Sequence, residues 1–303
     1  MAWTKLRQSV IGVGLMLALA GCTAVTLDEP DVDPTSPTEA TIVTAMGDVG
    51  FAVDGKLRLG ASKGAWAHYT LALRPLIIGD VNFANLQAVV TEQPLAPLEG
   101  KDNSFQMHTT GFQHLVEDLN LNLLSTAHDH GGDFGREGQA STLAALSAYK
   151  NSVMHHGLGT TADLSKAITG RVGEQEIAFA ALGLCANAPR PSSNGHPGQC
   201  TVASPPDWEK TVQAMMRRAE TFKVLSLHEG IEREPLPEPH IINRYRRAQF
   251  RADLDLIVAP HSHVVRGLEM DVEGRVIAYG LGDGMLHGSA DISDRGYESD
   301  FGL

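Results

Sequence analysis

The 303-residue sequence is poor in positive charge and in cysteine. It has 24 Lys and Arg against 36 Asp and Glu, which gives a formal net charge of −12 with neutral histidine. A nucleic-acid-binding protein usually carries a basic face, so we expect no nucleic acid as a partner. The sequence also lacks a GxSxG nucleophile elbow, a P-loop and a Rossmann glycine motif, so a serine nucleophile has little support.

The N-terminal apolar run, residues 10–20, is too short for a transmembrane helix, which needs about 20 apolar residues. It follows Lys5 and Arg7 and has the layout of a secretory signal. Residues 19–22, Leu-Ala-Gly-Cys, resemble a bacterial lipobox, in which cleavage leaves Cys22 as the lipidated first residue. An ordinary signal peptide with an incidental cysteine is the alternative. We expect residues 1–21 to be a lipoprotein signal peptide and Cys22 to anchor the chain in the cell envelope.

Thr23 is not the Asp that often retains lipoproteins in the inner membrane, so a Gram-negative cell would hold the protein at the periplasmic face of its outer membrane. Residues 22–40 mix acidic side chains with three prolines and predict an extended tether. In an oxidising compartment Cys185 and Cys200 predict a disulfide, which would stabilise a loop of about 15 residues by about 3 kcal/mol. Two free thiols or an intermolecular bond are the alternatives.

Residues 41–303 predict a single α/β domain, because β-rich runs alternate with segments of helical pattern. The runs lie at residues 41–46, 81–87, 121–126, 222–227 and 254–259, and the helical segments at 62–78, 110–119, 141–149, 208–221 and 239–252. Two hairpins, with turns at Gly173-Glu174 and Glu273-Gly274, add antiparallel strands. This order favours a two-sheet α/β sandwich of mixed, mainly parallel strands with helices on both faces.

Histidine, acidic and amide side chains gather where the predicted strands end, which is where open α/β sheets place their sites. Imidazole and carboxylate ligands together suit divalent transition metals such as Zn, Mn or Fe. Two metals about 3.5–4 Å apart can bind a phosphate-like group and activate water. The sequence therefore predicts a centre for one or two divalent ions, Mg included. The candidate residues are Asp48, Gln87, Asp129, His130, His228, His261 and His263.

Six motifs occur in a defined order along residues 41–284: Gly47-Asp48; Asn85-Leu86-Gln87; Ala127-His128-Asp129-His130 with Asp133-Phe134-Gly135; His228-Glu229-Gly230-Ile231-Glu232; His261-Ser262-His263 with Gly267-Leu268-Glu269; and Tyr279-Gly280-Leu281-Gly282-Asp283. Together they resemble the CapA family, the bacterial poly-γ-glutamate capsule-synthesis proteins. The resemblance implies a calcineurin-like metallophosphoesterase fold. Gln87 stands where the family has Glu, and Asp129 where it has Asn, so the charge of the expected ligand set is roughly conserved. We expect a rebalanced metal site; the opposite interpretation is a decayed site in a protein that only binds.

The resemblance implies roles for individual residues. The expected metal ligands are Asp48, Gln87 through its amide oxygen, Asp129, His228, His261 and His263. His130 is expected to donate a proton to the leaving group or to stabilise transferred charge. Asp133, Glu232 and Glu269 are expected to orient neighbouring histidines. We expect His155 and His156 to form a polar pair in a loop. The arginines of the 239–252 helix are expected to form either a solvated face or a surface for an anionic polymer.

The resemblance also implies a function. We expect a lipid-anchored envelope protein in the synthesis, attachment or release of an anionic capsule polymer of the poly-γ-glutamate type, through a divalent-metal, hydrolase-like site. Capsule-synthesis membrane proteins are further expected partners. The alternatives are a non-catalytic polymer-binding or assembly lipoprotein and a periplasmic phosphodiesterase. The last is less favoured because active metallophosphatases usually carry Asp-x-His, whereas Gly50 follows Val49 here.

Overall fold

The computed structural model describes residues 41–51, 70–71, 73–101, 104–164, 166–183, 198–199, 212–214, 217 and 221–287. Outside these ranges lie Cys22, Cys185 and Cys200, the expected signal peptide and tether, and most of the helices expected at 62–78 and 208–221. Within them, no helix combines the length and apolarity that crossing a bilayer requires.

The first of two stacked sheets has the strand order β15-β1-β2-β5-β6, and all of its paired strands run parallel. Its strands are β1 (Val43–Phe51), β2 (Val81–Leu86), β5 (Leu123–Ser125), β6 (Met154–His156) and β15 (Asp283–His287). Every residue of β2 is buried, because a central parallel strand is covered on both faces. The polar residues of the run at 81–87, which are Asn82, Asn85 and Gln87, are therefore buried as well.

The second sheet has the order β13-β14-β12-β11-β9-β8, with parallel pairs in its centre and an antiparallel pair at each edge. Its strands are β8 (Ile168–Val172), β9 (Gln175–Gly183), β11 (Phe222–His228), β12 (Leu256–Val258), β13 (Leu268–Met270) and β14 (Val276–Ala278). The antiparallel pairs are the two predicted hairpins. The predicted two-sheet α/β sandwich is confirmed.

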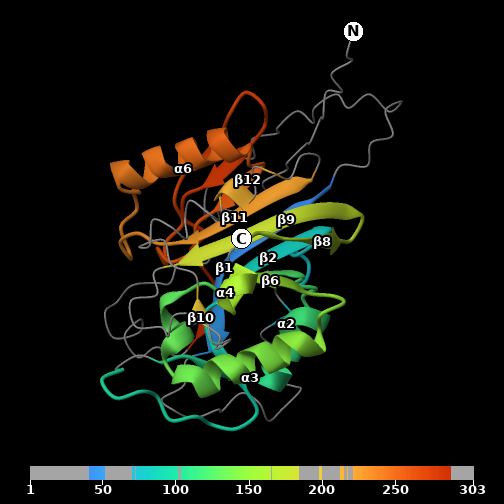
Figure 1. Cartoon of the computed structure of the whole chain (residues 1–303), viewed down its shortest axis with the longest axis vertical. Helices are drawn as coiled ribbons and strands as arrows, with labels where there is room; N and C mark the ends of the chain where they lie inside the picture. The colour runs from blue at the N-terminus through green and yellow to red at the C-terminus, as the bar shows by residue number, and fades with distance from the viewer. Residues whose placement is uncertain are drawn as a thin grey trace, which may run out of the picture.

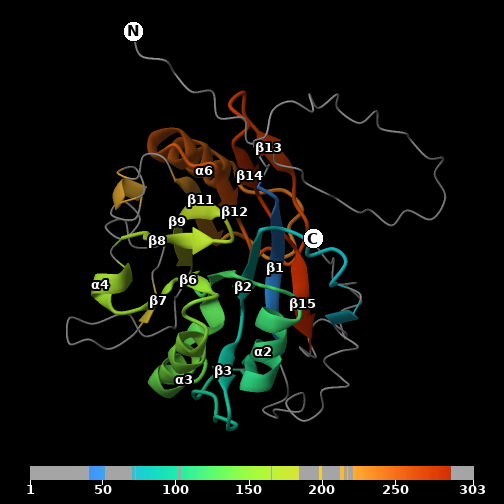
Figure 2. The same cartoon turned by 90° about the vertical axis from the view of Figure 1, so that its right-hand side faces the viewer.

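Helices cover the outer face of each sheet (Figures 1 and 2). One apolar core packs α2 (Thr109–Glu117) and α3 (Gly135–Ala148) on the first sheet, a second packs α6 (Pro239–Ala252) on the second sheet, and a third lies between the sheets. The layers therefore run helix, sheet, sheet, helix. Short elements complete the described chain: β3 (Val89–Thr91) paired with β4 (Gln106–His108), β7 (Leu158–Gly159) paired with β10 (Gly198–Gln199), η1 (Asp129–Gly132) and α4 (Thr161–Leu164).

Two local predictions need correction. The strand expected to end at Met46 continues to Phe51, and Asp48 lies inside it at a β-bulge rather than at its end. The bulge breaks the regular ladder and turns the Asp48 side chain out of the simple alternation of the strand. The stretch beginning at Asp283, for which we expected no strand, forms β15 and pairs with β1.

His156 joins the two sheets and does not belong to a polar loop pair, because β6 extends through both His155 and His156. The Ala181 N–H of β9 donates to His156 Nδ1 at 2.9 Å, and His156 Nε2 donates to the Lys166 carbonyl at 3.1 Å. The ring is buried, and burial lowers the pKa of His156 to about 4. The neutral ring therefore satisfies backbone groups that the sheet ladders leave open.

We predict that His156 makes stability depend on pH. Because the pKa of His156 is lower in the folded chain than its ordinary 6.5, the unfolded chain takes up the proton first. The contribution of His156 to the free energy of unfolding is fully present above its pKa in the unfolded chain. It falls by about 2 kcal/mol as the pH drops from about 7 to about 5. Urea unfolding with a chelator present should show a shallower pH dependence for His156→Gln than for the wild type. His240→Gln, at an exposed histidine of α6, is the control, and equal slopes for all three proteins would contradict the assignment.

Candidate metal centre

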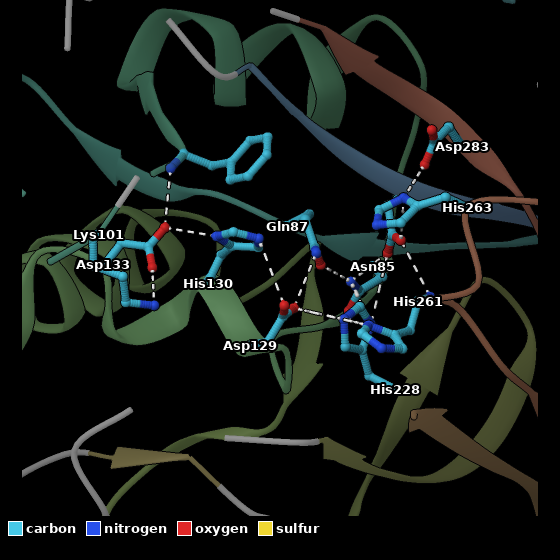
Figure 3. A network of polar contacts seen from close by, with 12 residues as sticks. Asn85, Gln87, Lys101, Asp129, His130, Asp133, His228, His261, His263 and Asp283 are labelled. Carbon is cyan, nitrogen blue, oxygen red and sulfur yellow. Dashed lines mark hydrogen bonds and ion pairs between the residues drawn. The ribbon is translucent and has the colours of Figure 1, made fainter. Parts of the chain in front are cut away.

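Polar side chains from both sheets meet at one edge of the sandwich. Asp48 comes from β1, Asn85 from β2 and His228 from the last position of β11. Asp129 begins η1 after β5, Asp283 begins β15, and the loop after β12 carries His261 and His263. Figure 3 labels Asn85, Asp129, His228, His261, His263 and Asp283 in one network, continued at one end by His130, Asp133 and Lys101. The structure therefore brings together all the residues that we expected as metal ligands.

Asp129, His228 and His261 form a first group, here called the Asp129 cluster. Asp129 Oδ1 lies 3.0 Å from His228 Nε2 and 4.0 Å from His261 Nδ1, and the two ring nitrogens lie 3.1 Å apart. Asp48, His263 and Asp283 form the Asp48 cluster, in which His263 Nδ1 lies 2.6 Å from Asp283 Oδ1 and 3.6 Å from Asp48 Oδ2. In each cluster the ligand atoms lie within 4.8 Å of one another.

Asn85 lies between the two clusters and contacts both. Its Nδ2 is 2.6 Å from Asp48 Oδ1, 2.8 Å from Gln87 Oε1 and 3.2 Å from His228 Nδ1. Gln87 Nε2 donates in turn to Asp129 Oδ1 at 3.2 Å. Both ends of the Gln87 amide are therefore engaged by protein, and its oxygen, which we expected as a ligand, accepts from Asn85.

The Asp129 cluster has the protonation state that a metal requires. Burial lowers the pKa of His228 to about 3 and also lowers the pKa of His261, so both rings are neutral near neutral pH. Burial alone would raise the pKa of Asp129, but the hydrogen bond from His228 and the charge of His130 bring it well below its usual range. The cluster thus offers one carboxylate and two neutral imidazoles.

In the Asp48 cluster, a proton on His263 supplies the positive charge that a bound metal cation would otherwise supply. Burial, together with the nearby Asp283, raises the pKa of Asp48 to about 7. Burial disfavours charge on His263, but the hydrogen bond with Asp283 and the charge of Asp48 outweigh it and raise the pKa of His263 to about 9. The imidazolium of His263 therefore balances the two buried carboxylates, and a divalent cation could take over this role.

The backbone around the histidines is strained. His261 and His263 have φ values of 90° and 55°, in the left-handed region that residues with a Cβ rarely adopt. Each such residue costs about 1–3 kcal/mol, and such strain concentrates at functional sites. Contacts fix the loop in place: the His261 N–H donates to Asp48 Oδ2 at 3.2 Å, and the Arg233 N–H donates to the Ser262 carbonyl at 2.7 Å.

His130 borders the Asp129 cluster, with its Nε2 3.6 Å from Asp129 Oδ2. Its Nδ1 contacts Asp133 Oδ2 at 2.8 Å, as expected for a carboxylate that orients a histidine. Asp133 is buried and is itself held by the Phe105 N–H at 3.1 Å and by Lys101 Nζ at 2.7 Å. Burial opposes protonation of His130, but the hydrogen bond to Asp133 and the charge of Asp129 raise its pKa. These contacts favour the protonated form of His130, which lies beside the cluster.

The other two carboxylates that we expected to orient histidines lie differently. Glu232 is exposed, and among the described residues it acts on His261 and His263 through its charge alone. Glu269 binds Arg246, with contacts of 2.8 and 2.9 Å, and accepts from the Tyr279 hydroxyl at 2.9 Å. It contacts no histidine of the centre within the described part of the chain.

Sequence reasoning missed two members of the centre. Asp283 and Asn85 were named only as members of their motifs and were assigned no role in the centre. The signal for Asp283 was an acidic residue after Gly282 at the closing motif. A Cβ on Gly47 would collide with the Gly282 carbonyl, so this close approach of two glycines is what sets Asp283 beside Asp48.

The residues present fit divalent metal ions. Each cluster combines imidazole nitrogen with carboxylate oxygen, the donor set of Zn, Mn and Fe sites. In addition, Asn85 Oδ1 is buried between the clusters and has no hydrogen-bond partner among the described residues. Such a buried oxygen costs about 1–3 kcal/mol, which an adjacent cation would relieve.

The fold is a two-sheet α/β sandwich with a polar, metal-suited centre at one edge. The chain belongs to the family described as bacterial capsule synthesis protein PGA_cap, whose model matches residues 42–286. This family relates the chain to capsule synthesis, in agreement with the resemblance drawn from the six motifs. A search of curated proteins found no match. The crystal structure of TT1561 of Thermus thermophilus aligns with 80% of this chain and 88% of that chain, at 12% identity and a TM-score of 0.43.

The contact between Gln87 and Asp129 generates a prediction for the metal-free protein. Gln87→Glu would place a second carboxylate against Asp129 Oδ1 and should lower the free energy of unfolding by about 1–3 kcal/mol. Adding Asp129→Asn should restore most of this loss, because the new amide can donate to the new carboxylate and still accept from His228. Urea unfolding of the wild type, both single variants and the double variant forms a complete cycle. Additive effects, with a coupling below about 0.5 kcal/mol, would contradict the proposed contact.

Proposed function

We propose that this protein is a lipid-anchored, metal-dependent hydrolase of the cell envelope that acts on an anionic capsule polymer of the poly-γ-glutamate type. The observation that carries the proposal is the pair of clusters joined by Asn85, with His130 at their border. Family membership supports the link to capsule synthesis. The Leu-Ala-Gly-Cys sequence before residue 23 supports the lipid anchor.

In this proposal Asp129, His228 and His261 hold one metal ion, and Asp48, His263 and Asp283 hold a second. Bound divalent metal would polarise the scissile carbonyl or phosphoryl group and lower the pKa of water. Asn85 positions Asp48 and His228 through its side-chain N–H groups.

His130 supplies the proton for the leaving group from Nε2. Asp133 fixes the orientation of the ring through Nδ1, and Lys101 and the Phe105 N–H hold Asp133 in place. Lys101 and Phe105 lie on a different loop from the metal ligands. Acid catalysis and metal binding can therefore be separated by mutation.

We predict that the purified protein binds about one or two divalent ions per chain after reconstitution and removal of free metal. It should then cleave poly-γ-glutamate. Less than about 0.3 ion per chain by plasma mass spectrometry would refute the hydrolase, since its metal affinity depends on this ligand set. Binding of polymer without turnover would instead support a non-catalytic polymer-binding protein. Cleavage of a generic phosphodiester in place of the polymer would identify a phosphodiesterase.

Two variants test the division of roles. His263→Ala should lower the metal content and abolish turnover. His130→Ala should keep the metal and lower turnover by about 10²–10⁴-fold, the usual contribution of a general acid. His240→Ala, at an exposed histidine of α6, is the matched control. Full turnover in His263→Ala would refute the site assignment, and loss of metal in His130→Ala would refute the separate role of His130.

The lipid anchor has its own test. Full-length protein expressed in a bacterium should sediment with membranes, and Cys22→Ser should shift it to the soluble fraction or leave the signal peptide uncleaved. Thr23→Ser is the matched control, because it alters the neighbouring residue and keeps the thiol. Membrane association of Cys22→Ser equal to that of the wild type, with normal processing, would refute lipidation at Cys22.

A further inference from the structure

Helix α6 exposes positive charge on a protein that is otherwise acidic. It has four arginines and no acidic residue, whereas the whole chain has a formal net charge of −12. Its buried residues include Ile241, Tyr245, Ala248 and Ala252, whose spacing of four, three and four turns one side of the helix toward the second sheet. The remaining surface of α6 faces outward, on the far side of the sandwich from α2 and α3 (Figures 1 and 2).

Three of the arginines, Arg244, Arg247 and Arg251, are spaced three and four residues apart and lie along one side of the helix; we call them the α6 arginine row. Arg247 and Arg251 are exposed, and within the described part of the chain neither makes an ion pair or a side-chain hydrogen bond. Phe250 lies beside them with 78% of its surface exposed. The fourth arginine, Arg246, is paired with Glu269.

The α6 arginine row begins next to the metal centre. Arg244 Nη1 contacts Glu229 Oε2 at 2.5 Å, and Glu229 directly follows His228 of the Asp129 cluster. From Arg244 to Arg251 the row spans about 10 Å along the helix, at 1.5 Å per residue. A chain-like ligand that occupies the centre could therefore continue along α6.

A solvated face is the ordinary interpretation of exposed arginines, but such faces usually mix both signs of charge. On α6 the guanidinium groups of Arg247 and Arg251 lie about one turn apart, next to an exposed aromatic ring. Guanidinium groups bind carboxylates with two parallel hydrogen bonds, and apolar methylene groups pack on aromatic rings. Repeating carboxylates on a methylene-containing backbone match this surface in charge and chemistry.

We infer that Arg247 and Arg251, together with Phe250, bind neighbouring carboxylates of an anionic polymer and hold it on α6 beside the metal centre. The inference rests on the proposed function for the identity of the polymer. It adds a binding site that is separate from the metal ligands. Binding of polymer at this site does not require metal, so the site can be tested with metal-free protein.

The test measures binding of fluorescent poly-γ-glutamate by the metal-free, full-length folded chain, using fluorescence anisotropy. Arg247→Glu/Arg251→Glu should weaken binding at least about tenfold, equivalent to 1.4 kcal/mol. Arg247→Gln/Arg251→Gln and Phe250→Ala should weaken it less, and they guard against effects of charge reversal on folding. Lys150→Glu/Lys166→Glu makes the same change in net charge at two exposed lysines outside α6 and should change affinity by less than about threefold.

The possible outcomes separate the binding site from the hydrolase. Equal losses in the α6 and control variants would mean that overall charge alone governs binding, and absence of wild-type binding would overturn the inference outright. Binding to phosphatidylglycerol vesicles that depends on the α6 arginine row, without polymer binding, would overturn it in favour of a membrane surface. If the protein binds no metal or shows no turnover but the arginine variants still lose affinity for the polymer, the proposed hydrolase is refuted and the α6 binding site is supported. If the wild type cleaves the polymer and the arginine variants bind it normally, the hydrolase is supported and the α6 binding site is refuted.

Discussion

The side-chain amide of Asn85 is the interaction on which the centre depends. Asp48 and His228 are fully buried and come from different sheets, and each needs a hydrogen-bond donor that carries no charge of its own. A buried ionisable group without a partner costs several kcal/mol or changes its protonation state. The two N–H groups on Asn85 Nδ2 are shared among Asp48, Gln87 and His228. Asn85 thereby couples the spacing of the two sheets to the spacing of the two clusters.

Local patterns were enough to predict the elements of this fold that depend on local forces. The bounds predicted for α6 agree with the structure, because Pro239 begins the helix and Asp253 ends it in a left-handed conformation. Both hairpins were predicted from their glycine-containing turns. The bulge at Asp48 and the strand β15 were not, because both arise from pairing between β1 and a segment near the other end of the described chain. His156 likewise shows its role only when β6 lies next to β9.

The motifs located the centre, but they did not reveal which residues touch. Nothing in the sequence shows that Gln87 and Asp129, which lie in separate motifs, share a hydrogen bond. Glu269 shows the opposite error. In the antiparallel pairing of β13 with β14 it lies opposite Ile277, a residue of the α6 core, so its side chain meets Arg246 on that face. A shift of register by one residue would have turned it to the other face of the sheet.

The pairing of β1 with β15 also has a consequence for how the protein reaches its active form. Asp48 lies opposite Asp283, so the Asp48 cluster needs both ends of the described fold in place. Contacts between residues so distant in sequence form late, because the entropy cost of closing the long loop comes before the contacts stabilise the chain. A chain that is still emerging from the ribosome carries Asp48 without Asp283 and His263. The complete centre can therefore form only after synthesis has passed Asp283, so a partly made chain cannot hold metal in the way that the finished domain can.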